Sequence, residues 1–156
     1  MTTESLLEAL RSPLGQELEP HHFDKLRELA KEVEFEEDHI IFSEDQPSED
    51  FYLILSGGIA LEIVIGGRPM CVQTLSSGDE LGWAAVLMRD GWHFQARCTC
   101  PVRAWAFHGP ALLEACKQDT AFGFALMRRL LEVVAGRLEA TRLQLLEVFK
   151  LKAKLA

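Results

Sequence analysis

Residues 78–87 read Gly-Asp-Glu-Leu-Gly-Trp-Ala-Ala-Val-Leu, and this stretch decides the fold. Gly78 and Gly82 permit a tight turn, and the small residues after Gly82 predict a short turn of helix. Several backbone N–H groups at such a turn are free to face an anion. We call residues 78–87 the cassette and expect it to form an anion cradle.

Short β-rich segments with turns at close spacing lie on both sides of the cassette. A strand pattern starts at Val33, and two β-rich runs flank a polar turn within residues 40–59. Gly66-Gly67 is a hairpin signal, and residues 94–100 and 102–107 are typical of further strands. This pattern predicts a small sandwich or a jelly-roll barrel.

Helical patterns precede and follow these strands. Residues 3–12 and a segment that starts at Pro20 predict N-terminal helices. Residues 111–117 predict a short helix, and a long helix follows to about residue 154, with Asp119 or Thr120 as its N-cap. We expect three parts, which are N-terminal helices (1–32), a β jelly-roll domain (33–109) and C-terminal helices (110–156).

The long helix carries an apolar seam whose members recur at alternating steps of four and three residues. The seam consists of Met127, Leu131, Val134, Leu138, Thr141, Leu145 and Val148. A second set widens the apolar face and consists of Leu130, Val133, Leu143, Leu146 and Phe149. Because this spacing is that of a coiled coil, we expect a parallel homodimer through the seam. Antiparallel and intramolecular packing are the alternatives.

The composition is that of a globular protein with an acidic body. The chain has 156 residues, of which 48% are hydrophobic and 26% charged, and its net charge is −8. Residues 121–156 hold seven Lys or Arg and three Glu, a local charge of +4, so the first 120 residues carry −12. The acidic body disfavours nucleic-acid binding. No apolar run is long enough to span a membrane, and the acidic N-terminus is unlike a secretory signal, so we expect a cytoplasmic protein.

Three segments resemble the cyclic nucleotide-binding domain family. Residues 44–57 are similar to its Glu-Gly-Asp-x-x-Asp-x-x-Tyr-x-Ile-x-x-Gly run, and residues 75–82 to its Leu-x-x-Gly-Asp-x-Phe-Gly. Residues 137–141, Arg-Leu-Glu-Ala-Thr, resemble the dimerisation helix of catabolite-activator-type regulators. The resemblance covers roughly residues 23–146. It implies a mainly β fold with some α, an eight-stranded jelly roll (a double-stranded β-helix) with N-terminal helices and a long C-terminal dimerisation helix.

The chain departs from this family at two ligand contacts. The family places a Glu after the second Gly, for the ribose 2′-hydroxyl, and Trp83 stands there. The family also places an Arg about ten residues further on, for the cyclic phosphate, where this chain has Trp92, His93 and Phe94. Together the two contacts contribute roughly 3–5 kcal/mol, so their loss weakens binding on the order of 10²–10⁴-fold.

These departures leave two interpretations of Trp83. Its indole either fills the nucleotide pocket and abolishes binding, or it stacks on a different ligand, such as a cyclic dinucleotide or an aromatic metabolite. In the family, a Thr at the position of Thr141 reaches the adenine. The candidate ligand contacts are therefore Gly82, Trp83, Ala84, Ala85, Trp92, His93, Thr141 and Arg142.

Other chemistry finds little support in the sequence. Cys98 and Cys100 share one strand face and are either a half metal site or redox pair, or small buried residues. The His-x-His pattern of cupin metalloenzymes, a serine-centred elbow and a Walker loop do not occur. We expect His21 and His22 to be solvated. The sequence thus predicts no catalytic residue, no metal and no cofactor, with a haem or redox sensor as a remaining alternative.

These features together favour a non-catalytic regulatory module. We expect it to act as a homodimer through protein–protein contacts with a protein partner, and to have weak or lost cAMP binding. The alternative is a small-ligand receptor that binds a cyclic nucleotide or another nucleotide through an altered cassette. Because the helix-turn-helix of the catabolite-activator-type regulators does not follow the long helix, direct DNA contact is not expected.

Overall fold

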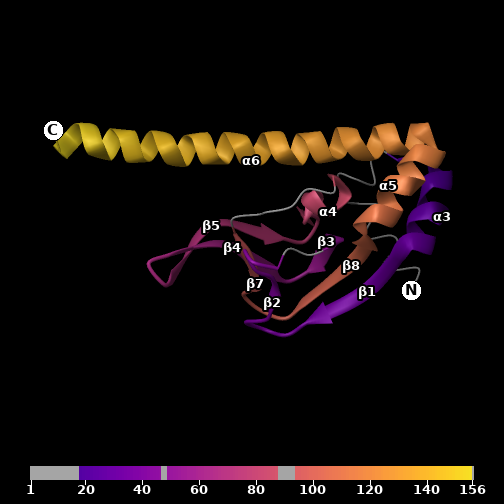
Figure 1. Ribbon diagram of the computed structural model, residues 1–156, viewed down its shortest axis with the longest axis horizontal. Helices are drawn as coiled ribbons and strands as arrows, with labels where there is room; N and C mark the ends of the chain where they lie inside the picture. Colours follow the sequence, from indigo (N-terminus) through magenta and orange to yellow (C-terminus); the bar gives the residue numbers. More distant parts are fainter. Residues whose placement is uncertain (1–17, 47–48, 88–93, 156) are drawn as a thin grey trace.

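Eight antiparallel strands form two four-stranded sheets (Figure 1) in the computed structural model, which describes residues 18–46, 49–87 and 94–155. The first sheet has the order β1 (Ala30–Phe35), β8 (Val102–His108), β3 (Asp50–Ser56) and β6 (Glu80–Leu81). The second has the order β2 (Ile40–Phe42), β7 (Gln95–Cys98), β4 (Gly58–Ile65) and β5 (Arg68–Ser76). The eight-stranded jelly roll expected from the sequence is confirmed.

The two central strands of the first sheet are buried on both faces. Phe51 and Leu53 of β3 join Trp105 of β8 in a core that the helices cover. Tyr52 and Ile54, which point to the opposite face because strand side chains alternate, join the core between the sheets. The first sheet is therefore the shared wall between the inside of the roll and the layer of helices.

Four helices belong to the described part of the chain. They are α3 (Pro20–Leu29), α4 (Trp83–Leu87), α5 (Gly109–Gln118) and α6 (Thr120–Leu155). Asp119 caps α6, because its Oδ1 accepts a hydrogen bond of 3.1 Å from the Phe122 N–H. None of these helices is long and apolar enough to cross a membrane.

Only the first third of α6 is embedded in the body. Phe122, Leu126 and Leu130 are buried in the core beneath the helices, whereas no residue of α6 after Leu130 is buried. Figure 1 shows α6 running along one side of the roll and continuing past it. The later turns of α6 are thus held by a small number of specific contacts rather than by a continuous core.

Two glycines let the cassette sit close to its neighbours. Gly82 has a φ of +83°, which favours glycine, and a Cβ there would lie 2.8 Å from the Asp50 carbonyl oxygen. Gly109, the first residue of α5, has no room for a Cβ, which would lie 2.1 Å from the Ala85 carbonyl oxygen. The cassette is therefore pressed between β3 and α5, and its position is fixed by backbone contacts.

Two details differ from the sequence-based expectations. β1 starts at Ala30 rather than Val33, because the backbone of Ala30 is already extended where α3 ends. The expectation that His22 is solvated is wrong, since its side chain is only 3% exposed. His22 Nδ1 accepts a hydrogen bond of 3.2 Å from the Glu19 N–H, and its ring packs edge-on against Phe122. The helix predicted over residues 3–12 lies outside the described residues.

Candidate functional site

A cavity of about 320 Å³ separates the later turns of α6 from the roll. Strands β4 and β5, the start of α4 and one face of α6 form its walls. The lining residues are Leu61, Ile63, Val72, Gln73, Trp83, Phe94, Val134, Arg137, Leu138, Thr141 and Gln144. We call this space the helix cavity. Its volume lies at the lower end of the range for small-molecule sites, and its lining is mostly apolar, as such sites usually are.

The cassette has the backbone form that its glycines predict. The Gly78 N–H donates to the Ile54 carbonyl at 2.9 Å, and the Ala85 N–H donates to the Gly82 carbonyl at 3.0 Å. Trp83 begins the short helix α4, as expected from the small residues that follow it. Its indole packs against the core under the helices and also lines the helix cavity. Trp83 therefore forms a wall of this cavity and leaves space beside it.

The carboxylate of Glu80 joins the cassette to α6. Its side chain is 2% exposed, and Arg129 donates to it twice, from Nε to Oε1 at 2.7 Å and from Nη2 to Oε2 at 3.1 Å. Such a bidentate, charge-assisted pair is among the stronger polar contacts in proteins. The hydrogen bond to Glu80 accordingly raises the pKa of Arg129 above its ordinary value. We call this pair the Glu80 clamp.

A second arginine of α6 reaches the same residue of the cassette. The Arg137 Nη2 donates a hydrogen bond to the Glu80 carbonyl oxygen. Arg137 also lines the helix cavity, and burial lowers the pKa of its guanidinium despite the nearby charges of Glu80 and Asp79. Within the described residues it forms no ion pair with a carboxylate. Arg137 is thus a desolvated cation in the cavity wall, and its hydrogen-bond partner is the Glu80 carbonyl oxygen.

Two further polar contacts involve residues of α6 that line the cavity. The Gln144 Nε2 donates to the Val72 carbonyl of β5 at 2.5 Å. The Thr141 hydroxyl donates to the Arg137 carbonyl at 2.9 Å, one turn back in the same helix. Gln144 therefore ties α6 to the second sheet, while the proton of the Thr141 hydroxyl is used within the helix.

The structure brings together only part of the predicted ligand set. Trp83 and Thr141 line the helix cavity, whereas Ala84 and Ala85 are buried and Arg142 is exposed. Gly82 provides the turn that places Trp83, and Trp92 and His93 lie outside the described residues. Arg137 lines the cavity but was not among the predicted contacts. A sequence signal for it exists, because Arg137 precedes Thr141 by four residues and so shares its helix face.

The predicted seam of α6 meets three different environments. Met127 packs against the core under the helices, and Val134, Leu138 and Thr141 line the helix cavity. Leu138 is also 51% exposed, and the remaining members have exposed fractions of 68% for Leu131, 52% for Leu145 and 59% for Val148. The seam is therefore shared with the chain's own body only in part, and most of its members reach solvent.

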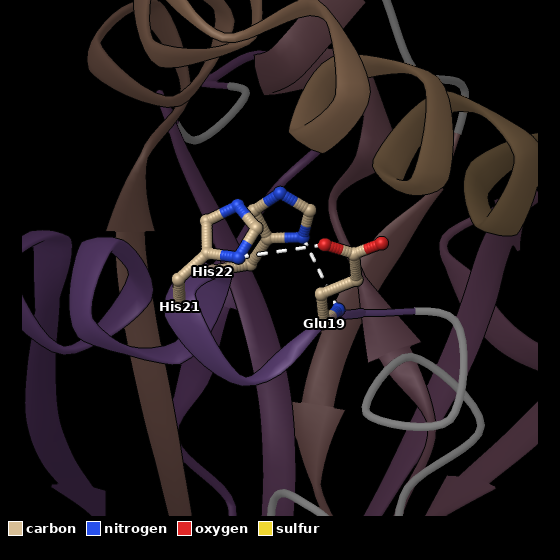
Figure 2. A group of neighbouring side chains, drawn as sticks. All are labelled: Glu19, His21 and His22. Carbon is tan, nitrogen blue, oxygen red and sulfur yellow. Dashed lines mark hydrogen bonds and ion pairs between the residues drawn. The ribbon is translucent and has the colours of Figure 1, made fainter.

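Glu19, His21 and His22 also lie together, at the start of α3 (Figure 2). Their ligand-type atoms are within 4.8 Å of one another. However, His22 Nδ1 already accepts the Glu19 N–H, and His21 Nδ1 lies 3.4 Å from the Glu19 carboxylate. The cluster is thus explained as a capping arrangement of α3, in which the lone pair of His22 Nδ1 is used.

Two of the four cysteines, Cys98 and Cys116, are buried. Cys98 is buried, and burial raises its thiol pKa to about 11. Cys116 is also buried, with its pKa raised to about 11 for the same reason. Because the thiolate is the nucleophile and metal ligand, the raised pKa values disfavour the reactive form of both thiols at neutral pH. The expectation that Cys98 and Cys100 share one strand face is wrong, since β7 ends at Cys98 and Cys100 follows it. The interpretation of Cys98 as a small buried residue therefore fits the structure better than a redox pair.

Comparison with known proteins gives a consistent result. The family model described as "Cyclic nucleotide-binding domain" matches residues 32–119, and no curated protein matches the chain. A cyclic nucleotide-binding domain from Methylobacillus flagellatus is similar, with a TM-score of 0.79, 16% identity, and coverage of 92% of this chain and 82% of that one. The catabolite activator protein of Thermus thermophilus has a TM-score of 0.71 and 20% identity, and the match covers 88% of this chain and 63% of that one. The sensor domain of the transcriptional regulator DNR from Pseudomonas aeruginosa has a TM-score of 0.64 and 17% identity, and the match covers 80% of this chain and 89% of that one.

The substitution Arg129→Met tests the Glu80 clamp. It leaves a buried carboxylate without its partner, so we expect a loss of about 3–5 kcal/mol in the free energy of unfolding, measured with urea. The double variant Glu80→Gln/Arg129→Met should recover part of this loss. The matched control is Arg103→Met, which breaks a half-exposed pair with Glu32 at 3.1 Å and should cost less than about 1 kcal/mol. Equal losses for Arg129→Met and Arg103→Met would contradict the clamp.

Proposed function

We propose that this chain, which belongs to the cyclic nucleotide-binding domain family, is a non-catalytic regulatory module that acts as a homodimer through protein–protein contacts. Classical cAMP binding is weak or lost in this proposal, and α6 carries the output. The observation that supports it most is the position of α6. This helix is clamped to the cassette through Glu80 and extends an apolar surface beyond the roll.

The later turns of α6 expose many large apolar side chains. Leu131, Leu145 and Val148 continue the seam, and the neighbouring exposed residues are Leu143, Leu146, Phe149 and Leu151. Contiguous apolar patches of this kind mark interaction surfaces. Because the seam repeats every seven residues, a second copy of α6 offers the same exposed members, Leu131, Leu138, Leu145 and Val148. These features support a homodimer through α6.

The walls of the helix cavity support weak cAMP binding. Trp83 occupies the position at which the family carries the carboxylate for the ribose 2′-hydroxyl, and none of the described lining residues is an Asp or a Glu. A buried sugar hydroxyl without a partner is costly. A cyclic nucleotide in this cavity would therefore lose polar contacts that it makes with water.

A second candidate function, a small-ligand receptor, has its own supporting observation. The helix cavity remains open beside Trp83, and the half-buried guanidinium of Arg137 lies in its wall. An apolar cavity with a convergent charged group is the usual form of a ligand site. In this function, a ligand in the cavity contacts Arg137 and changes how α6 is held at Glu80.

Sedimentation tests the homodimer. We expect the wild-type protein to be a dimer at micromolar concentration and Leu145→Glu to weaken the dimer by roughly 100-fold, because a carboxylate must lose water within the seam. The control is Lys150→Glu, on the side of α6 opposite the seam, which should remain dimeric. A wild-type protein that is monomeric at these concentrations excludes this proposal.

Calorimetry with cAMP tests the weakened nucleotide site. We expect a dissociation constant in the millimolar range for the wild-type protein, roughly 10²–10⁴-fold weaker than a site with both charged contacts. Trp83→Glu restores the family's carboxylate and should bind cAMP more tightly than Trp83→Gln, which has the same size without the charge. Micromolar binding of cAMP by the wild-type protein would refute weak binding.

A further inference from the structure

Arg137 differs from the other two arginines that contact buried acidic residues. Arg97 Nε lies 3.0 Å from the carboxylate of Glu62, and Arg129 Nε lies 2.7 Å from that of Glu80. Those carboxylates raise the pKa values of Arg97 and Arg129, whereas burial lowers that of Arg137. Arg137 is thus desolvated without an anionic partner among the described residues.

Arg137 lines the helix cavity and has more donors than its described contacts use. A guanidinium has five N–H donors, and the Glu80 carbonyl oxygen accepts one of them. The Glu80 carboxylate is already engaged by Nε and Nη2 of Arg129. An anion that enters the helix cavity therefore meets a guanidinium that forms no ion pair with a described carboxylate, with Glu80 and Asp79 nearby. A planar carboxylate fits such a fork in a bidentate manner.

The remaining walls favour a flat apolar body rather than a sugar. Trp83 and Phe94 contribute aromatic surface, and Leu61, Ile63 and Leu138 contribute aliphatic surface. Aromatic rings pack well on such walls. The amide of Gln144 is occupied by the Val72 carbonyl, and the Thr141 hydroxyl donates within its own helix. Among the described lining residues, few polar groups besides Gln73 therefore remain for ribose hydroxyls.

We propose that the helix cavity binds a small aromatic monocarboxylate, with the carboxylate on Arg137 and the ring against Trp83 and the aliphatic walls. This inference rests on the second proposed function, the small-ligand receptor. It names a ligand class that differs from a cyclic nucleotide in lacking a sugar. A volume of about 320 Å³ suits one ligand with one or two rings.

Pairs of probes that differ only in charge test this proposal. We would titrate the full chain with benzoate, phenylacetate and naphthoate and with the matching amides, benzamide, phenylacetamide and naphthamide. Calorimetry gives the affinities, and Trp fluorescence reports contact with Trp83. At least one acid should bind below about 1 mM and more tightly than its amide by roughly 10- to 100-fold.

Variants identify the guanidinium as the source of this preference. Arg137→Gln should abolish the preference for acid over amide, Arg137→Lys should retain part of it, and the control Arg128→Gln, an exposed residue of the same helix, should leave it unchanged. The preference is a ratio measured within one variant, so it does not depend on a change in stability. Trp83→Phe should remove the fluorescence response and keep the calorimetric preference.

Several results would overturn the proposal. These are no binding by any of the three acids below about 5 mM, equal affinity for an acid and its amide, or a preference that survives in Arg137→Gln. Titration of the same samples with cAMP, cGMP and a cyclic dinucleotide separates this failure from that of the receptor function. A protein that binds one of these nucleotides and no acid refutes only the ligand class, and a protein that binds neither refutes the receptor function as well.

Discussion

The ion pair between Glu80 and Arg129 is the constraint on which the site depends. Glu80 lies in β6, paired with β3, so its position is fixed by the first sheet. Arg129 lies one residue before the last buried position of α6. The pair therefore sets the distance between the cassette and the helix at the point where the core ends. Beyond this point the helix cavity opens, and Arg137 and Gln144 hold α6 over it.

Successive parts of α6 have different surroundings. The start of α6 is embedded in the core and follows the body, while its later turns are free to meet a partner. Between the two lies a cavity whose wall includes Trp83 from the cassette and Arg137 from α6. Arg137 also contacts the Glu80 carbonyl, so the wall of the cavity and the Glu80 clamp share one residue of the cassette. The regulatory function that we propose uses this connection and requires only binding.

The sequence reveals the elements better than their contacts. Alternating strand patterns, the Gly66-Gly67 hairpin and the helical period of residues 120–155 are local signals, and the strands, the hairpin and the long helix are correctly predicted. The pairing of Glu80 with Arg129 joins residues 49 positions apart and follows no period. The role of Arg137 as a cavity residue and the burial of His22 likewise depend on how helices dock on the roll. A polar residue on a predicted helix is indistinguishable from a solvated one until that docking is known.

Amide hydrogen exchange along α6 tests the central claim, that Glu80 holds this helix to the cassette, most directly. The comparison is between the wild-type protein and Glu80→Gln, which keeps the shape of the side chain and removes its charge. The account predicts exchange at least about tenfold faster in residues 129–141, with β3 and β8 unchanged, because the later turns have little other packing. Unchanged exchange in α6, or an equal increase throughout the roll, would contradict it.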